Sequence, residues 1–391
     1  MARAMRCISG DSHVEIDSKH WAPRVPAKFR ERAPHIVRTA TGGDAWIIEG
    51  SPAREVPSDL YGGKGRDHWQ PFGQRYEDTP GTGGPEQRLK EQDREGVDAE
   101  VLYPPQVGGP TLWRNIRDDE PYKAMVRAYN DWLALDYCAA DPERLIGLGI
   151  MPMSGIDDVL AELEHCKKLG YKGVLLNAFP DNKGYPSPQD DLFWAASLEM
   201  AMPVTIHVEL NRQGPRSGPI FHYPKEDPAI MDALQINFAE QVSRFHRVAG
   251  LNAVQLLLSG LFDRFPKLKI YMAETHAGWV PFFYYMADLR YQRHHWWAEQ
   301  HLGFKPLKRL PSDYMREHVY WGFMDDPVGI ENRRHMGVDR LIWCSDFPHQ
   351  ESDWPDSQPL LDRIFEGVPA EDRYKMVAGN VIEFFHLNGA E

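Results

Sequence analysis

The sequence of 391 residues lacks the features of a membrane or secreted protein. It contains no apolar run of about 18 residues or more, the length that a membrane-spanning helix needs. Roughly the first 30 residues lack the apolar core of a signal peptide. Only four cysteines are present, far apart, and none forms a Cys-x-x-Cys pair. We therefore expect reduced thiols, neither disulfides nor a thiolate metal site, and a cytoplasmic protein.

Two nucleotide-binding signatures are also absent. Neither the G-x-G-x-x-G fingerprint nor the G-x-x-x-x-G-K-[ST] phosphate loop occurs. The formal net charge of −13 disfavours nucleic acid or an anionic membrane as the main partner. What remains is the composition of a globular enzyme or binding protein with a sizeable core.

Strand and helix patterns alternate along most of the chain, beginning with an apolar run at Cys7-Ile8. The later predicted strands are Ala99–Tyr103, Leu145–Met151, Gly173–Leu176, Pro203–His207, Lys269–Ala273, His318–Gly322 and Leu341–Cys344. The predicted helices are Pro85–Glu95, Asp118–Ala139, Gly155–Leu169, Asp190–Met200, about Ala229–Phe265, Val280–His301, one near Asp326–Gly337, and two at the C-terminus. Eight such units favour a (β/α)8 TIM barrel of the α/β class over an open doubly wound sheet.

A long stretch rich in proline and glycine follows the first strand, from about Ile16 to Gly84. It contains one predicted hairpin, formed by Val37–Ala40 and Ala45–Glu49. We interpret the stretch as a loop-rich insertion on the barrel. The whole chain, residues 1–391, is therefore expected to form one domain.

Residue types that bind metals recur at the C-terminal ends of predicted strands. Asp11 and His13 follow the first strand, His207 the fifth, His276 the sixth and Asp346 the eighth. Each alone has an ordinary structural explanation, such as a helix cap for an aspartate. In a barrel, however, these strand ends share the face where active sites are built. Two carboxylates with two or three imidazoles suit Zn²⁺, Fe²⁺ or Mn²⁺ better than Ca²⁺ or Mg²⁺.

Several motifs extend this pattern over nearly the whole chain. They are Asp11-Ser12-His13, the segment Gly96–Pro104, Thr205-Ile206-His207, Ala-Glu-Thr-His-Ala-Gly-Trp-Val-Pro at 273–281, Ser-Asp-Phe-Pro-His at 345–349, and Gly379-Asn380-Val381. With them the chain resembles the amidohydrolase superfamily, in particular the branch of aminocarboxymuconate-semialdehyde decarboxylase. The resemblance implies that Asp11, His13, His207 and Asp346 hold a metal. It also implies that His276 is the catalytic histidine.

Two departures from that branch bear on the number of metal ions. The first strand offers Asp-x-His where the branch usually has His-x-His, which makes the site more anionic and favours a harder or a second cation. Asn177 stands where binuclear members carry a carboxylated lysine. We expect one ion, Zn or Fe with Mn as an alternative. A second ion would use Glu15, Glu274 or His276.

Hydrolysis is the reaction we expect first: metal-activated water attacks an amide, ester or thioester carbonyl while His276 and Asp346 move the proton. The alternative is metal-dependent, non-oxidative decarboxylation, which needs a cationic clamp for the carboxylate. Arg212, Arg216 and Arg290 are candidates, but the sequence assigns none, so hydrolysis is slightly favoured. A third hypothesis is an inactive barrel that acts as a binding protein.

Aromatic residues crowd the segment after the sixth strand and occur near other strand ends. Such residues usually form core, but some are expected to line a pocket for a bulky hydrophobic or aromatic carboxylic acid derivative. The predicted substrate contacts are Trp113, Trp279, Phe347 and Arg212. The segment His294-His295-Trp296-Trp297 is an alternative candidate for a subunit interface, and we expect a homodimer.

Overall fold

The computed structural model describes residues 5–55, 60, 63–105, 109–210 and 247–387, with a few residues between 224 and 242. Its barrel strands are β1 (Ile8–His13), β5 (Ala99–Tyr103), β6 (Leu145–Gly147), β7 (Gly149–Ile150), β8 (Val174–Leu176), β9 (Val204–His207), β10 (Ile270–Ala273), β11 (Val319–Phe323) and β12 (Leu341–Trp343). The predicted strand Leu145–Met151 is divided into β6 and β7 because its first part pairs with β5 and its second part with β8.

The strands lie side by side in sequence order, all parallel. The last strand returns to the first: Asp346 N donates to Asp11 O at 3.0 Å, and His13 N donates to Phe347 O at 2.7 Å. This closure requires glycine at position 10, since a Cβ there would lie 2.3 Å from Ile342 Cγ2. The predicted TIM barrel is confirmed.

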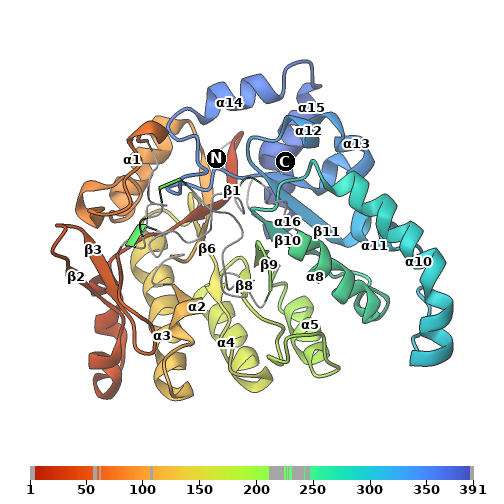
Figure 1. Ribbon diagram of the computed structural model, residues 1–391, viewed down its shortest axis with the longest axis horizontal. Helices are drawn as coiled ribbons and strands as arrows, with labels where there is room; N and C mark the ends of the chain where they lie inside the picture. Colours follow the sequence, from red (N-terminus) through yellow and green to blue (C-terminus); the bar gives the residue numbers. More distant parts are fainter. Residues whose placement is uncertain are drawn as a thin grey trace.

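Helices cover the outside of the barrel (Figure 1). They are α1 (Pro85–Glu95), α2 (Pro110–Trp113), α3 (Asp119–Trp132), α4 (Ile156–Leu169), α5 (Asp190–Glu199), α8 (Arg247–Leu258), α9 (Leu261–Arg264), α10 (Val280–Leu302), α11 (Pro311–His318), α12 (Pro327–Glu331), α13 (Arg333–Met336), α14 (Ser357–Ile364), α15 (Ala370–Tyr374) and α16 (Asn380–Phe385). No helix in these described ranges is long and apolar enough to span a membrane.

Three predicted helices differ from the observed ones. The helix predicted to Ala139 ends at Trp132 and continues as a π-helical turn, Leu133–Tyr137. The helix near Asp326–Gly337 is divided at Asn332, whose backbone is not helical. The region Ala229–Phe265 lies partly outside the described residues. Its described part is divided by Gly260, whose φ of 74° is left-handed and unstrained only for glycine.

The loop-rich insertion packs onto the barrel. Its hairpin is β2 (His35–Arg38) with β3 (Asp44–Ile47), extended by β4 (Arg54–Glu55), close to the prediction. Trp21 packs against Trp113 with ring centroids 4.8 Å apart, and Leu60 pairs with His349 near the strand ends. All four cysteines are free and buried, as predicted.

Candidate metal centre

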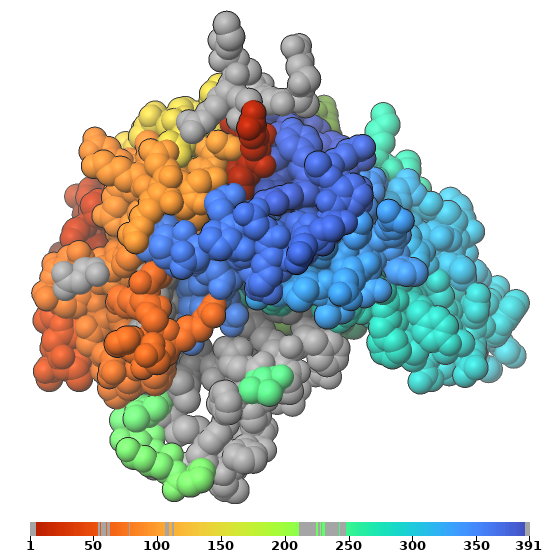
Figure 2. Space-filling model, turned by 90° about the horizontal axis from the view of Figure 1, so that it is seen from above, coloured from red at the N-terminus to blue at the C-terminus, as the bar shows by residue number. Residues whose placement is uncertain are grey.

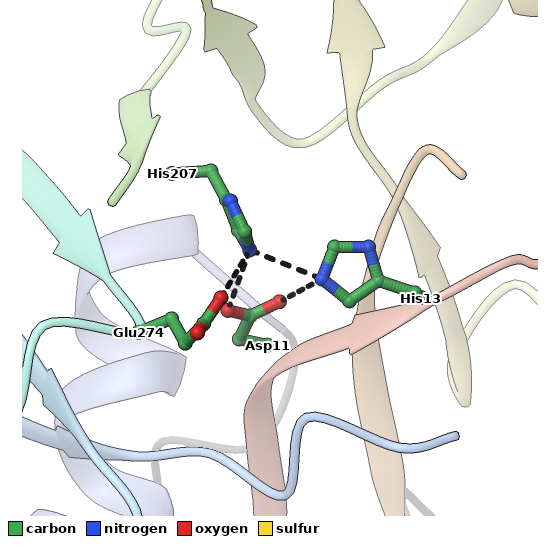
Figure 3. A group of neighbouring side chains, drawn as sticks. All are labelled: Asp11, His13, His207 and Glu274. Carbon is green, nitrogen blue, oxygen red and sulfur yellow. Dashed lines mark hydrogen bonds and ion pairs between the residues drawn. The ribbon is translucent and has the colours of Figure 1, made fainter. Parts of the chain in front are cut away.

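Three of the predicted metal ligands, Asp11, His13 and His207, converge at the C-terminal ends of their strands (Figure 3). From Nε2 of His13, at the end of β1, His207 Nε2 is 3.0 Å away and Asp11 Oδ1 is 3.5 Å away. Asp346 Oδ1, which follows β12, is 3.4 Å from the same nitrogen. A donor atom of each of the other three predicted ligands therefore lies within 3.5 Å of His13 Nε2.

Glu274 joins this group from the end of β10. Its Oε2 lies 3.1 Å from His207 Nε2, which is 3.4 Å from Asp11 Oδ2. Asp11, His13, His207 and Glu274 offer ligand atoms that all lie within 4.8 Å of one another. The sequence suggested Glu274 for a second ion, whereas the structure places it in the same group as Asp11, His13 and His207. His276, two residues later and half-buried, belongs to neither group of candidate ligands found among the described residues.

Backbone strain is concentrated at these strand ends. Val208, Glu274, His276 and Asp346 have φ angles of 60°, 52°, 54° and 52°, in the left-handed region that non-glycine residues rarely adopt. Each such residue costs about 1–3 kcal/mol and persists only where the surroundings impose it. After β10 the imposing group is Asp326, whose Oδ2 accepts hydrogen bonds from Ala277 N and Gly278 N at 2.6 and 2.8 Å. Strain of this kind is typical of functional sites.

The electrostatics of the first group suit a cation. His13 Nδ1 must donate to the carbonyl oxygen of Pro104 at 2.8 Å, which leaves the lone pair on Nε2 facing the group. Burial lowers the pKa of His13 well below its usual value, so the ring is neutral. Burial also lowers the pKa of His207, but Asp11 and Glu274 outweigh it and raise that pKa to about 9. Two imidazole nitrogens 3.0 Å apart beside buried carboxylates need a proton or a cation between them.

Asp11 gives the clearest test of whether a metal fits. It is fully buried, burial raises the pKa of its carboxyl group, and neither carboxylate oxygen accepts a hydrogen bond from any residue that the structure describes. Buried polar atoms are nearly always hydrogen-bonded. A carboxylate with two buried oxygens and no donor is the arrangement expected of a metal ligand, and the donor set fits a divalent ion.

Asp346 belongs to a second buried group, in which three side chains are hydrogen-bonded in series. His349 Nδ1 lies 2.9 Å from Asp346 Oδ1, and His349 Nε2 lies 3.0 Å from Glu15 Oε1. Burial raises the pKa of Asp346 to about 7, although His349 opposes this. Burial lowers the pKa of His349, but Asp346 and Glu15 outweigh it and raise that pKa well above its usual value. Glu15, suggested as a spare ligand, holds His349 instead. The sequence analysis missed His349, although the Asp-x-x-His spacing of its motif was a signal.

Arg88, on α1, contacts both the end of β1 and the segment after β12. It is 1 % exposed, and its guanidinium donates to the carbonyl oxygens of His13 at 3.0 Å and Phe347 at 3.2 Å. Its Nε donates to Glu100 Oε2 at 2.6 Å, so the buried charge is paired. Arg88 therefore fixes the chain next to His13 and Asp346. Nothing in the sequence singled it out from the other charges of its helix.

The predicted substrate contacts do not gather at this centre. Trp113 is fully buried against Trp21 and Tyr129 in the core. Phe347 is 1 % exposed and packs against Trp354 and Arg88. The third aromatic contact, Trp279, packs on Trp321, and its indole donates to a backbone oxygen. Trp113 and Phe347 thus pack as core residues, and Trp279 is partly buried against the core. Arg212 and Arg216 lie outside the described residues, and Arg290 is exposed on α10.

A family model described as amidohydrolase matches residues 20–387. The chain belongs to the amidohydrolase family. The match begins after Asp11 and His13, so these two residues are placed at the site by the geometry alone. The resemblance stated from the motifs is thereby confirmed, and this amidohydrolase is an enzyme of that superfamily.

Known relatives of this amidohydrolase include decarboxylases. A gamma-resorcylate decarboxylase of Rhizobium sp. is 26% identical over 338 residues, covering 83% of this chain and 92% of the relative. An amidohydrolase structure from Mycobacterium avium subsp. paratuberculosis has a TM-score of 0.70 at 20% identity and covers 98% of this chain and 100% of its own. A dihydroxybenzoic acid decarboxylase from Polaromonas sp., with bound manganese and 2-nitroresorcinol, has a TM-score of 0.62 at 20% identity and covers 98% of each chain.

Proposed function

We propose that this protein is a metal-dependent decarboxylase of a small aromatic carboxylic acid. The observation that carries the proposal is the similarity, over 83% of the chain, to a gamma-resorcylate decarboxylase. It reverses the order of the hypotheses from the sequence, where hydrolysis was slightly favoured. The relatives reported above give hydrolysis of an amide, ester or thioester no specific support, so it becomes the second candidate.

Asp11, His13, His207 and Asp346 would hold one divalent cation, with Glu274 beside His207. Their donor atoms lie 3.0 to 3.5 Å from His13 Nε2. Ligand bonds of about 2.0–2.2 Å separate adjacent donor atoms by roughly 3.0–3.5 Å. Imidazoles mixed with carboxylates suit Mn²⁺ as well as Zn²⁺ or Fe²⁺, and the Polaromonas relative has manganese bound. When bound, such a cation would neutralise and orient the carboxylate of the acid.

Decarboxylation breaks the bond between a ring carbon and the carboxyl carbon. Carbon dioxide leaves, and the ring carbon takes a proton in its place. Asp346 is the candidate to hold that proton, because its buried carboxyl group lies 2.9 Å from His349 Nδ1, with which it can share a proton. His349 and Glu15 extend the hydrogen-bonded chain away from Asp346 and keep its carboxylate in place. His276 remains the second candidate for proton transfer.

The test uses hydroxybenzoic acids labelled with ¹³C in the carboxyl group. Metal-stripped protein is reloaded separately with Mn²⁺, Zn²⁺ and Fe²⁺, and release of labelled carbon dioxide is followed by mass spectrometry. The methyl esters and amides of the same acids form a matched panel for hydrolysis. The expected result is carbon dioxide from at least one acid, dependent on metal and absent in His207→Ala.

Two results would contradict the proposal. Hydrolysis of the esters or amides without carbon dioxide from any acid would make the protein a hydrolase. Tight binding of the acids with no reaction of either kind, and metal content far below one ion per chain, would make it a binding protein.

A further inference from the structure

Helix α10 projects from one edge of the molecule (Figures 1 and 2). Its inner face is well packed: Val280 and Tyr284 are buried, and the Tyr284 hydroxyl accepts a hydrogen bond from Trp321 Nε1 at 2.9 Å. Further along, the Tyr291 hydroxyl accepts a hydrogen bond from Leu307 N at 2.7 Å. The helix is therefore held in place without the residues of its opposite side.

That opposite side is also apolar. Phe282, Tyr285 and Trp296 are 69%, 62% and 66% exposed, and Leu289 between them is partly buried. With Arg293 they form a single stripe at helical spacing, which we call the α10 face. A helix that is apolar on both sides is normally buried on both sides. The α10 face has the composition of a surface that is covered in the working assembly.

We propose that the α10 face is the twofold interface of a homodimer, in which two copies of α10 pack antiparallel about an axis at Leu289. In such a pair, a residue n positions before the axis meets the residue n positions after it on the other copy. Phe282 and Trp296 lie seven positions before and after Leu289, and Tyr285 and Arg293 lie four positions before and after it. The face is therefore complementary to its own copy.

The residue pairs that this symmetry brings together are of types that attract one another. Phe282 would pack on Trp296 of the partner subunit as an aromatic pair. Tyr285 would pack under Arg293 of the partner subunit as a cation–π pair. Leu289 would meet Leu289 of the partner subunit, so the axis itself brings no like charges together. An anionic membrane is a poor alternative for a chain with a net charge of −13.

The available area is sufficient. An aromatic side chain offers about 150–250 Å², so four of them exposed by half to two thirds, Trp297 included, supply on the order of 500 Å². A standard interface buries about 800 Å² per partner. Met286, Leu289 and the stem of Arg293, which lie on the same side of the helix, add to this area.

The test is a pair of cysteine variants of the full chain. In Leu289→Cys the two new thiols meet at the axis, so mild oxidation should give a disulfide-linked dimer in high yield. Glu299→Cys is the matched control: it is exposed on the same helix, but ten positions from the axis it lies roughly 30 Å from its own copy and should stay unlinked. The native cysteines are all buried and do not interfere.

Light scattering and sedimentation then measure the assembly. The unmodified chain should be a dimer, and Trp296→Ala should raise the dissociation constant by roughly 30-fold or more, as for an interface hot spot. Tyr185→Ala, with a tyrosine 60% exposed elsewhere, should leave the dissociation constant unchanged. A monomer at tens of micromolar, a dimer that Leu289→Cys fails to link, or a monomer that binds anionic vesicles through Trp296 would each overturn the proposal.

Discussion

Two buried aspartates, Asp11 and Asp346, lie at similar distances from His13 Nε2, at 3.5 and 3.4 Å. They differ in what else they contact. No described residue donates a hydrogen bond to either oxygen of Asp11, whereas His349 lies 2.9 Å from Asp346 Oδ1 and is itself held by Glu15. Burial raises the pKa of both carboxyl groups.

This difference separates two tasks within one site. The oxygens of Asp11 lie 3.4 Å from His207 Nε2 and 3.5 Å from His13 Nε2, the nitrogens of two other predicted ligands, which suits a residue that only binds a cation. Asp346 shares an oxygen with an imidazole, which suits a residue that also holds and transfers a proton. Substitution of the same type at the two positions should therefore give different results.

The largest effect is expected for Asp11→Asn. Loss of a charged ligand should reduce bound metal to below about one tenth of an ion per chain, and with it all activity, because the chemistry depends on the cation. Metal content is measured by plasma mass spectrometry. Without metal, the variant should melt no lower than the unmodified chain, since it removes a buried carboxylate without donors. A variant that keeps its metal would contradict the assignment of Asp11 as a ligand.

Asp346→Asn should separate metal binding from turnover. The variant leaves intact the group of Asp11, His13, His207 and Glu274, whose ligand atoms all lie within 4.8 Å of one another. It should therefore keep more metal than Asp11→Asn, while kcat falls by about 10²–10⁴ because the proton carrier is lost. Both quantities are measured on the same preparation. Equal metal loss in the two variants would show that Asp346 acts as a ligand only, and the contrast between the aspartates would fail.

His349→Gln tests the support of Asp346. Glutamine keeps a hydrogen-bonding side chain but cannot carry the positive charge that Asp346 and Glu15 favour. Loss of such an outer partner typically costs 10–100-fold, so kcat should fall by about that factor with metal content unchanged. His165→Gln, a histidine paired with Asp131 by a side-chain contact of 2.6 Å, is the control. A rise in KM with kcat unchanged would place His349 in substrate binding instead.

The sequence predicted the barrel and the converging ligands because both depend on local patterns. Apolar strands and the residue types at their ends are visible along the chain, and parallel strands bring those ends to one face. Glu274 and His207 could be proposed on this basis alone. Their mutual contact could not, since it depends on the left-handed turn after β10 that Asp326 stabilises.

The residues that the sequence analysis missed are those whose role depends on distant partners. His349 contacts Glu15 across 334 positions, and Arg88 reaches Phe347 across 259. A charged helix gives no sign that one arginine points inward. The aromatic contacts show a different limit: Trp113 near a strand end has the same sequence pattern whether it lines a pocket or, as its burial here indicates, packs in the core.

The smallest effect concerns Glu95, a buried carboxyl group outside the metal centre that shows what burial alone does. It is 2 % exposed, Ser357 Oγ donates to its Oε1, and burial, followed by repulsion from Glu100, raises its pKa to about 8. The folded protein thus keeps a proton that the unfolded chain releases above pH 4.5, the ordinary pKa of this group. The contribution of this proton to the free energy of unfolding is full below pH 4.5 and declines as pH rises toward 8, by about 1.4 kcal/mol per pH unit.

Glu95→Gln removes this contribution, so the melting temperature of the variant minus that of the unmodified chain should rise by a few degrees between pH 6 and 8 and then level off. Glu86→Gln, exposed in the same helix, should show no such rise. A flat difference for Glu95→Gln would mean that Glu95 ionises in the folded protein, and that burial without a charged partner does not hold protons on carboxylates here.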